Sequence, residues 1–399
     1  MDGETPVLPM IPEIHFVSGF LGSGKTTAIV NACRVLLERG ISPAIVTNDQ
    51  GSRQVDGAFA RIARIPSVGV SNGCLCCRYD DFEQRVLELA ASERPKVIFA
   101  ESVGSCADIV ATVVRPFAAF RATHRPRGLL STFVDVRMLE RRLAERADGV
   151  RRLPFSDNVL YIFDKQLEEA DIIVINKRDL IDPARAMAVR DATQALFQNT
   201  PVVLHEGRDV RAADGWLKLL GEERPADATG LHPSERPALD LDYDRYAAGE
   251  IEMAWLDEEF IIDARRGGTG GRSISLNAVS GLFWALARAL EQDGLPVTHL
   301  KFAWETGSDG GKLSLTAGET VSRDKAQVDD VEMQRLVEAP VTVTVNIRAV
   351  AAPEQLAEAM DRALDEQQQL TDTLVLSSQG RDTFRPGYPR PVHRLSEES

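Results

Sequence analysis

Short apolar runs alternate with amphipathic stretches through the first half of the chain. The runs are rich in Val and Ile and nearly continuous, which is typical of strands in a parallel sheet covered on both faces. Gly40 follows the first amphipathic stretch as a C-cap. The pattern predicts strands at Ile14–Ser18, Pro43–Thr47, Lys96–Ala100, Ser131–Val136, Asp171–Ile175 and Pro201–Leu204, and helices at Thr26–Arg39, Asp80–Ser92, Val159–Glu169 and Ala184–Phe197. This order predicts an α/β class, with a doubly wound, mostly parallel sheet.

A different pattern begins after about Leu239, where several strand-like runs follow one another between two helical stretches. This order favours a second, smaller α+β domain. His299 and Lys301 alternate on one of its strands, and we expect them on a half-exposed strand face. The predicted strands are Glu259–Asp263, His299–Trp304, Lys312–Thr316 and Val341–Ile347, and the predicted helices are Leu276–Gln292 and Pro353–Gln367.

Composition shifts divide the chain into four parts. They are a first domain at 1–225, a linker at 226–240, a C-terminal domain at 241–380 and a Pro-containing tail at 381–399. Three prolines predict that the tail is extended. Two interpretations of it stay open, which are a recognition segment for a partner and an arm packed on the second domain.

The charge balance excludes some function classes. The chain has 46 basic and 60 acidic residues and a net charge of −14, which argues against nucleic-acid binding because phosphate contacts need clustered Lys and Arg. Without a long apolar run or a signal-peptide pattern at the start, we expect no membrane span and a cytoplasmic location. Three of the five cysteines lie within four residues, which indicates metal or thiol chemistry rather than a disulfide framework.

The first strand leads into Gly19-Phe20-Leu21-Gly22-Ser23-Gly24-Lys25-Thr26, which fits the P-loop pattern. Glycines let backbone N–H groups surround phosphate oxygens without a side chain in the way. We expect Lys25 to reach the β- and γ-phosphates and the Thr26 hydroxyl to bind Mg²⁺. The residues predicted to bind the nucleotide here are Gly22, Ser23, Gly24, Lys25, Thr26 and Thr27.

A second nucleotide motif, Asn176-Lys177-Arg178-Asp179, follows the strand Asp171–Ile175. The Asp179 carboxylate can accept two hydrogen bonds from guanine, whereas adenine presents no matching pair of donors. We expect Asn176 to support the edge of the base and the stem of Lys177 to lie along the ring. The motif therefore predicts GTP rather than ATP.

The cysteines of Cys74-Leu75-Cys76-Cys77 can converge on one soft ion such as Zn²⁺. One loop offers at most three sulfurs, so another ligand must complete a closed tetrahedral site. Inert buried cysteines and a redox pair are the alternatives. Cys33 and Cys106 are interpreted as small core residues.

Together these motifs resemble the CobW-type GTPases, a metallochaperone-like family within the SIMIBI class of P-loop proteins. The resemblance covers roughly residues 14–220 and includes Gly73 before the cysteines. Further matches are Asn48-Asp49-Gln50-Gly51 with Asp56 in the first switch region, Glu101-Ser102-Val103-Gly104 in the Walker B place, Val134-Asp135, and Gln166 with Ala170-Asp171. The C-terminal domain matches only in the order of its elements, which indicates a divergent branch.

The resemblance implies binding and slow hydrolysis of GTP with Mg²⁺, and binding of Zn²⁺, Co²⁺ or another transition metal at Cys74, Cys76 and Cys77. Lys25 and Thr26 are the expected catalytic residues of the P-loop. Asp49 and Glu101 are expected to hold Mg²⁺ or to position water. The resemblance does not say which residue has which role. Asp49 and Gln50 stand where relatives carry Glu and Phe.

The function expected from the resemblance is a metallochaperone that assists a client metalloenzyme or a corrinoid-dependent protein. In the rival interpretation, the chain is a GTP-gated adaptor whose cysteines hold a structural zinc that is never transferred. A small-molecule kinase is disfavoured by the Asn-Lys-x-Asp motif. The sequence is compatible with a homodimer.

Overall fold

A computed structural model describes residues 12–48, 55–120, 128–221, 238–264, 273–307, 309–316, 335–370 and 374–395. Asp49 and most of the predicted linker lie outside these ranges. No helix within them is both long enough and apolar enough to cross a membrane.

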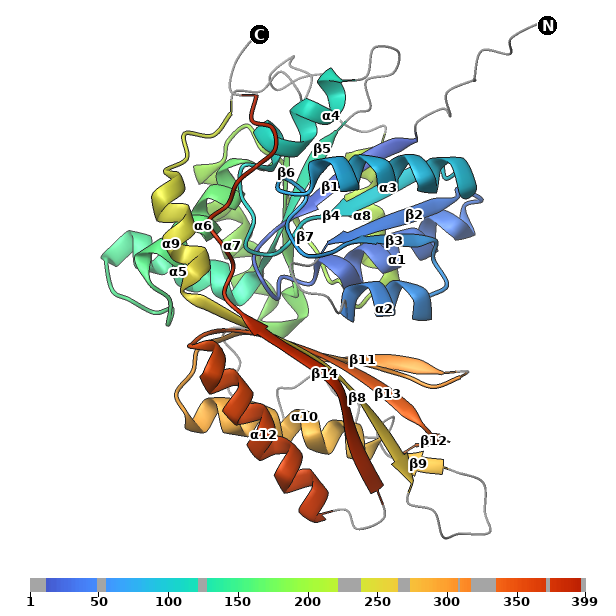
Figure 1. Cartoon of the computed structure of the whole chain (residues 1–399). Helices are drawn as coiled ribbons and strands as arrows, with labels where there is room; N and C mark the ends of the chain where they lie inside the picture. The colour runs from blue at the N-terminus through green and yellow to red at the C-terminus, as the bar shows by residue number, and fades with distance from the viewer. Residues whose placement is uncertain are drawn as a thin grey trace, which may run out of the picture.

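A seven-stranded parallel sheet forms the centre of the first domain (Figure 1). Its strand order is β3-β2-β4-β1-β5-β6-β7, so the chain crosses the sheet in both directions from β1, which confirms the predicted doubly wound fold. The strands are β1 Glu13–Ser18, β2 Pro43–Asn48, β3 Ser67–Val70, β4 Val97–Glu101, β5 Leu129–Asp135, β6 Ile172–Asn176 and β7 Val202–Leu204.

Helices cover both faces of this sheet because alternate strand residues point to opposite sides. Phe16 packs on the face covered by α3 and α4, and Val17 packs on the face covered by α1 and α8. Gly40 follows α1 with φ 73°, as expected for a C-cap glycine. The helices are α1 Lys25–Glu38, α2 Val55–Ile62, α3 Tyr79–Ser92, α4 Arg115–Ala119, α5 Val136–Asp148, α6 Asp157–Glu168, α7 Pro183–Leu196 and α8 Ala213–Leu220.

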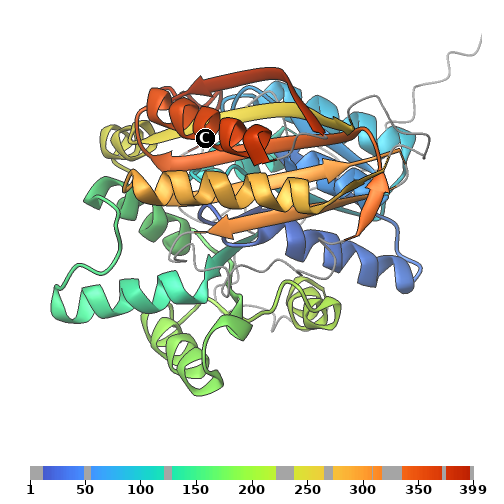
Figure 2. The same ribbon diagram turned by 90° about the horizontal axis from the view of Figure 1, so that it is seen from below.

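A five-stranded antiparallel sheet forms the second domain, in the order β11-β10-β13-β8-β14. Two helices, α10 and α12, lie side by side across its outer face (Figure 2). A short helix, α9, precedes the sheet and packs on α6. The elements are α9 Tyr243–Ile251, β8 Met253–Ala264, β9 Ser273–Ser275, α10 Asn277–Gln292, β10 Val297–Glu305, β11 Gly310–Thr316, β12 Leu336–Glu338, β13 Val341–Val350, α12 Pro353–Leu370 and β14 Leu374–Phe384.

The inner face of the second sheet lies against the first domain. On β10, Leu300 and Phe302 enter the core under α10 and α12, so His299, Lys301 and Ala303 face the other way. Ala303 packs there on Val55 of α2. The expectation of a half-exposed strand face is therefore wrong, because the first domain covers it.

The C-terminal segment after β14 crosses back to the first domain, as the red trace in Figure 1 shows. β14 ends at Phe384, so regular structure extends into the segment expected to be a tail. The Val392 N–H donates to the carbonyl of Cys76 at 3.0 Å, and the Leu395 N–H donates to the carbonyl of Ala111 at 2.9 Å. Arg394 pairs with Asp108 at 2.7 Å. The end of the tail therefore packs on the first domain, which neither sequence interpretation anticipated.

Candidate functional site

The P-loop lies between β1 and α1, so the first N–H groups of α1 point into it. Lys25 is buried and its Nζ donates to the carbonyl of Gly19 at 2.6 Å. Gly24 adopts φ 87°, and a Cβ there would lie 2.5 Å from Nδ2 of Asn176. Burial lowers the pKa of Lys25 to about 8. The loop therefore has the open backbone and the buried cation that a phosphate site requires.

Glu101 ends β4 directly beside α1. Its Oε1 accepts a hydrogen bond from the Thr26 hydroxyl at 2.9 Å. Its Oε2 is buried and has no hydrogen-bond partner among the residues that the structure describes. Burial and the charge of Asp56 raise the pKa of Glu101 to about 7. A hydroxyl and a carboxylate oxygen with unused lone pairs fit the oxygen ligands that Mg²⁺ prefers.

The Asn-Lys-x-Asp motif lies at the end of β6. The Asn176 side chain donates to the carbonyl of Ser23 at 2.8 Å and accepts from the N–H groups of Lys177 and Gly207, both at 2.8 Å. Asn176 therefore joins three loops, and its support of the base edge stays a prediction. Asp179 is exposed at the rim of the site.

Lys177 has its Nζ 3.1 Å from the Asp135 carboxylate and donates to the Thr316 hydroxyl at 2.7 Å. Burial alone would raise the pKa of Asp135, but Lys177 and Arg137 hold it at about 2. Thr316 belongs to β11, so the motif touches the second domain.

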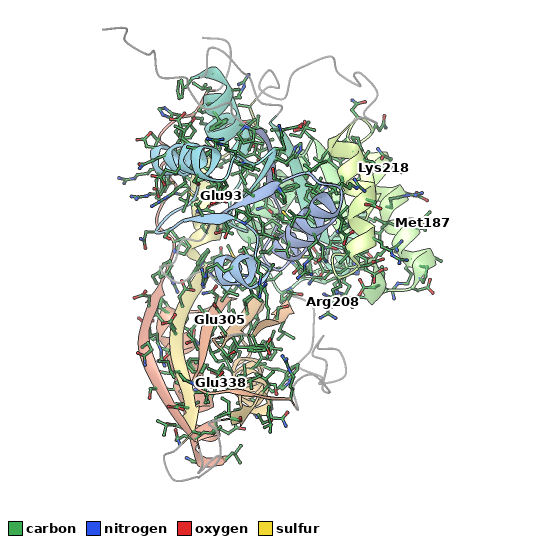
Figure 3. The ribbon with its side chains drawn as sticks, turned by 90° about the vertical axis from the view of Figure 1, so that its right-hand side faces the viewer. Glu93, Met187, Arg208, Lys218, Glu305 and Glu338 are labelled. Carbon is green, nitrogen blue, oxygen red and sulfur yellow. The ribbon has the colours of Figure 1, made fainter. Side chains whose placement is uncertain are left out.

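One cavity joins these groups. Predicted residues that line it are Gly22, Gly24, Lys25, Thr26, Thr27, Glu101, Asn176, Lys177 and Asp179. Ser23 lies in the same loop with its side chain buried. Residues that the sequence analysis did not assign to the site also line the cavity, namely Gly207, Arg208, Lys301, Lys312, Ser314 and Thr316. Arg208 lies at the junction of the two domains in Figure 3.

Asp56 in the first turn of α2 connects the predicted switch region to the second domain. Its carboxylate accepts hydrogen bonds from Lys301 at 2.7 Å and from Lys312 at 2.9 Å. Burial alone would raise the pKa of Asp56, but the two lysines hold it well below its usual range. Burial lowers the pKa of Lys312, and Asp56 opposes that shift.

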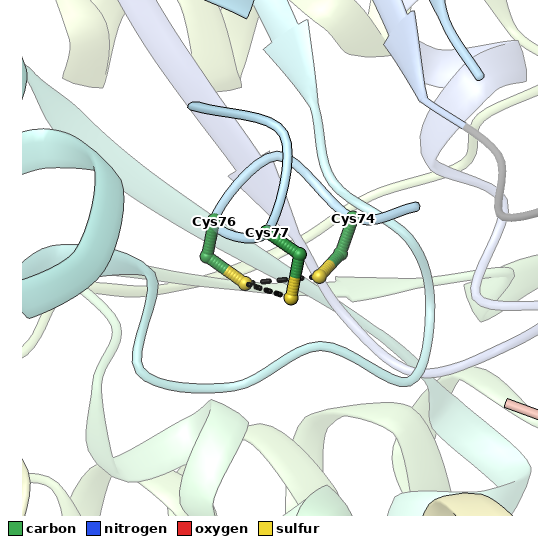
Figure 4. Close-up of side chains that lie close together, drawn as sticks. All are labelled: Cys74, Cys76 and Cys77. Atoms are coloured by element: carbon green, nitrogen blue, oxygen red, sulfur yellow. Dashed lines mark hydrogen bonds between the residues drawn. The ribbon is translucent and has the colours of Figure 1, made fainter. Parts of the chain in front are cut away.

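The three clustered cysteines lie in the turn between β3 and α3, with their sulfurs directed toward one another (Figure 4). The sulfurs of Cys74 and Cys76 are 3.0 Å apart, and those of Cys76 and Cys77 are 3.8 Å apart. Cys74 and Cys76 are buried, and Cys77 is partly exposed. Three converging thiols are a donor set that suits Zn²⁺.

Cys106 packs in the same buried cluster as Cys74 and Cys76 but is not one of the three sulfurs that lie within 4.8 Å of one another. Interactions with the neighbouring thiols of Cys106, Cys76 and Cys77 hold the pKa of Cys74 well below the usual thiol value. Cys106 and Cys33 are both fully buried, as expected of core residues. Only Cys33 packs in the core on the opposite face of the sheet, under α1.

Asn48 links the cysteine loop to the end of β2. Its side-chain amide donates to the carbonyl of Gly73 at 2.8 Å and to that of Val70 at 3.1 Å. Its Oδ1 accepts from the N–H of Leu75 at 3.1 Å. The loop is therefore held by the first residue of the predicted first switch segment.

Residues 13–203 match the family described as CobW/HypB/UreG, nucleotide-binding domain. This part of the chain belongs to that family. The match confirms the resemblance inferred from the P-loop, the cysteine motif and the Asn-Lys-x-Asp motif.

Relatives of this CobW/HypB/UreG domain include proteins named as zinc chaperones. Zinc chaperone CobW from Sinorhizobium is 28% identical over 273 residues, which cover 63% of this chain and 76% of the relative. Zinc chaperone YeiR from Escherichia coli is 28% identical over 44% of this chain and 49% of its own length. Zinc-regulated GTPase metalloprotein activator 1 from Dictyostelium discoideum is 32% identical over 23% of this chain and 22% of its own length.

Among solved structures, HypB from Helicobacter pylori in complex with nickel aligns with 53% of this chain and 86% of its own. The TM-score is 0.38 and the sequence identity is 14%. At that level of similarity the alignment adds nothing to the family assignment.

The CobW/HypB/UreG motifs account for one wall of the cavity only. Lys301 and Lys312 stand in strands that the sequence predicts, and the alternation with Leu300 and Leu313 shows that they share the face away from the hydrophobic core. Nothing in the sequence showed that the P-loop covers that face. One feature of the sequence indicated that Cys106 lies near the site, which is its position five residues after Glu101.

Proposed function

We propose that the chain binds GTP with Mg²⁺, hydrolyses it slowly, and carries Zn²⁺ or a related metal on Cys74, Cys76 and Cys77 for a client metalloenzyme. The names of the relatives support a zinc chaperone. Reduced thiols fit a cytoplasmic location. The observation that carries the proposal is the pair of connections from the nucleotide cavity to the cysteines, through Asn48 and through the loop that follows Glu101.

In this proposal the residues of the cavity position the nucleotide. The backbone of the P-loop and Lys25 hold the phosphates, Asp179 accepts the guanine N–H groups, and Thr26 and Glu101 hold Mg²⁺. The ion supplies charge neutralisation at the phosphates during hydrolysis. Asp49 remains a proposed partner of Glu101 in positioning water or Mg²⁺.

The cysteines respond to the nucleotide because the same backbone segments reach both places. Glu101 is at the phosphate end of the loop that carries Cys106, and Asn48 holds the cysteine loop from the end of β2. A change in either segment between GTP and GDP therefore alters the distances among the thiols. Metal affinity and nucleotide affinity are then coupled reciprocally.

A second candidate function is a GTP-gated adaptor with a structural zinc. The burial of Cys74 and Cys76, 5% and 3% exposed, and the cover that the tail gives to Cys76 favour it. The two candidates differ in whether the metal leaves the protein.

The test is release of zinc to a chromophoric chelator from protein with a GTP analogue, with GDP or without nucleotide. The metallochaperone predicts a release rate that depends on the nucleotide and serine variants of Cys74, Cys76 or Cys77 that bind metal weakly. Slow release that is equal in all nucleotide states contradicts it and supports the adaptor.

A further inference from the structure

The second domain brings two ammonium groups to the phosphate end of the cavity. Lys301 lies on β10 and Lys312 on the paired strand β11, two register positions apart and so on the same face, and both side chains line the cavity with Lys25 and Thr26. The side chains are only 14% and 10% exposed. Burying lysines costs free energy unless anionic partners hold them.

Asp56 accepts hydrogen bonds from both of these lysines. Each ammonium group carries three N–H donors and no acceptor, so an anion that enters the cavity can accept hydrogen bonds from them in place of Asp56. The cavity lining contains five basic side chains and two carboxylates, since Arg208 and Lys177 also face it. Basic side chains still outnumber carboxylates when Asp56 and Asp135, which pair with three of the lysines, are counted, and this favours a polyanion such as a nucleoside triphosphate.

The two domains are close enough for one small anion to touch both. A Cβ on Gly22 of the P-loop would lie 2.8 Å from the side chain of Thr316 on β11. The P-loop and the inner face of the second sheet are therefore in van der Waals contact beside the cavity. Phosphates held by the P-loop lie within reach of side chains from that sheet.

We propose that Lys301 and Lys312 bind the phosphates of the nucleotide, so that the second domain completes the nucleotide site. This inference rests on the proposed binding of GTP. Phosphate oxygens take over hydrogen bonds that Asp56 accepts in their absence, and α2 is then held less tightly to the second sheet. The contact between the domains thus depends on the number of phosphates bound.

The test compares Lys301→Met and Lys312→Met with Lys218→Met, a control on the exposed side of α8. Affinities for GTP, GDP and GMP are measured by competition with a fluorescent guanine nucleotide. Removing one buried, paired charge is expected to weaken GTP at least about 30-fold. The loss is expected to be smaller for GDP and smallest for GMP, and the control should match the wild type.

The double variant Asp56→Asn, Lys301→Met guards against misfolding, because it leaves no unpaired carboxylate beside the missing lysine. We expect it to unfold near the wild-type temperature and still bind GTP weakly. Unchanged GTP affinity in the lysine variants, or an equal loss for GTP and GMP, overturns the inference. If the wild type itself fails to bind GTP, the proposed function fails instead.

A separate observation concerns the metal. Cys106 is fully buried and packs in the same cluster as Cys74 and Cys76, outside the group of three sulfurs that lie within 4.8 Å of one another. It comes from the loop after β4, whereas the other three cysteines come from the turn before α3. Three sulfurs leave one position of a tetrahedral zinc site open, and two loops can supply four.

We infer that Cys106 is the fourth sulfur ligand of the metal proposed to bind at Cys74, Cys76 and Cys77. The metal then joins the turn before α3 to the loop that begins at Glu101. Because Glu101 accepts the hydrogen bond of Thr26, a shift at the phosphate end of this loop moves a metal ligand directly. A closed shell also holds the metal more tightly than three sulfurs from one turn.

Co²⁺ is the probe for this inference, since the intensity of its thiolate charge-transfer absorption rises with the number of bound sulfurs. Cys106→Ser is expected to lose about a quarter of that intensity if four sulfurs bind. Cys33→Ser, the matched buried control, should keep all of it, and thermal unfolding should show that both variants fold.

X-ray absorption of the zinc-loaded proteins gives a second count, of four sulfurs in the wild type and three in Cys106→Ser. Equal sulfur counts and equal Co²⁺ spectra in the two proteins overturn the inference. If the wild type binds no Co²⁺ or Zn²⁺, the metal-binding part of the proposed function fails.

Discussion

The side-chain amide of Asn48 donates a hydrogen bond to the carbonyl of Gly73 across 2.8 Å. Asn48 also accepts from the N–H of Leu75, so it bonds on both sides of Cys74. The residue is buried and stands at the end of a central strand of the sheet. This geometry makes Asn48 a direct connection from β2 to the turn that carries the thiols.

Asn48→Ala should remove the dependence of metal affinity on the bound nucleotide. Losing these hydrogen bonds frees the cysteine loop at a cost of about 1–3 kcal/mol, whereas the P-loop keeps its contacts. We expect the ratio of Co²⁺ affinities with a GTP analogue and with GDP to fall toward one, measured by absorption titration. Asn158→Ala, on α6, is the control. A wild-type ratio in Asn48→Ala would exclude this connection as the route.

The tail offers a second experiment at the metal site. The Val392 N–H donates to the carbonyl of Cys76, and the Val392 side chain is 46% exposed. Val392→Pro removes that donor, while Val392→Ala keeps it and changes only side-chain size. We expect Val392→Pro to release zinc to a chelator several times faster than the wild type, and Val392→Ala to match the wild type. Equal rates in all three proteins would show that the tail does not restrict access.

Local patterns were enough to predict the first domain. Central strands such as β1 and β6 are buried on both faces and read as unbroken apolar runs. The P-loop and the Asn-Lys-x-Asp loop each lie at the end of such a strand, so the sequence predicted their shared edge of the sheet. The fold class and the principal lining of the cavity followed from these neighbours along the chain.

The start of β8 and the burial of Lys301 were not predicted from the sequence, because both depend on partners that are remote in sequence. β8 begins at Met253, but buried Asp257 and Glu258 interrupt its apolar pattern. Their charges are paired by Arg348 at 2.5 Å and Arg381 at 2.7 Å, which come from β13 and β14. Lys301 was likewise assigned to a half-exposed strand face because its partner Asp56 is far away in the sequence. Such pairings arise only when the sheets have assembled.

Asp179→Asn should change which base the cavity accepts. The amide presents a donor where the guanine amino group also donates, so one hydrogen bond to the base is lost and two donors face each other, and GTP affinity should fall about 10- to 100-fold. Xanthosine triphosphate has a carbonyl at that position and should bind the variant better than GTP does. Competition against a fluorescent nucleotide measures the affinities for GTP and for xanthosine triphosphate. Asp191→Asn is the exposed control. Unchanged preference for GTP would show that Asp179 does not contact the base.

Asp135→Asn should reveal a pH-dependent contribution to stability. Lys177 and Arg137 hold the pKa of the buried Asp135 at about 2, below the ordinary 3.8, so the folded state favours the charged form. That stability is fully present above about pH 4 and declines as pH falls through about 2. The difference corresponds to roughly 2 kcal/mol.

Urea unfolding of the wild type and of Asp135→Asn at several pH values between 7 and 2.5 measures this contribution. Other carboxylates titrate in both proteins, so the difference between the two free energies of unfolding isolates Asp135. We expect that difference to be nearly constant from pH 7 to pH 5 and to shrink below pH 4. A difference that stays constant down to pH 2.5 would show that the charge of Asp135 contributes nothing, and that its hydrogen bonds alone cap α5 and hold Lys177.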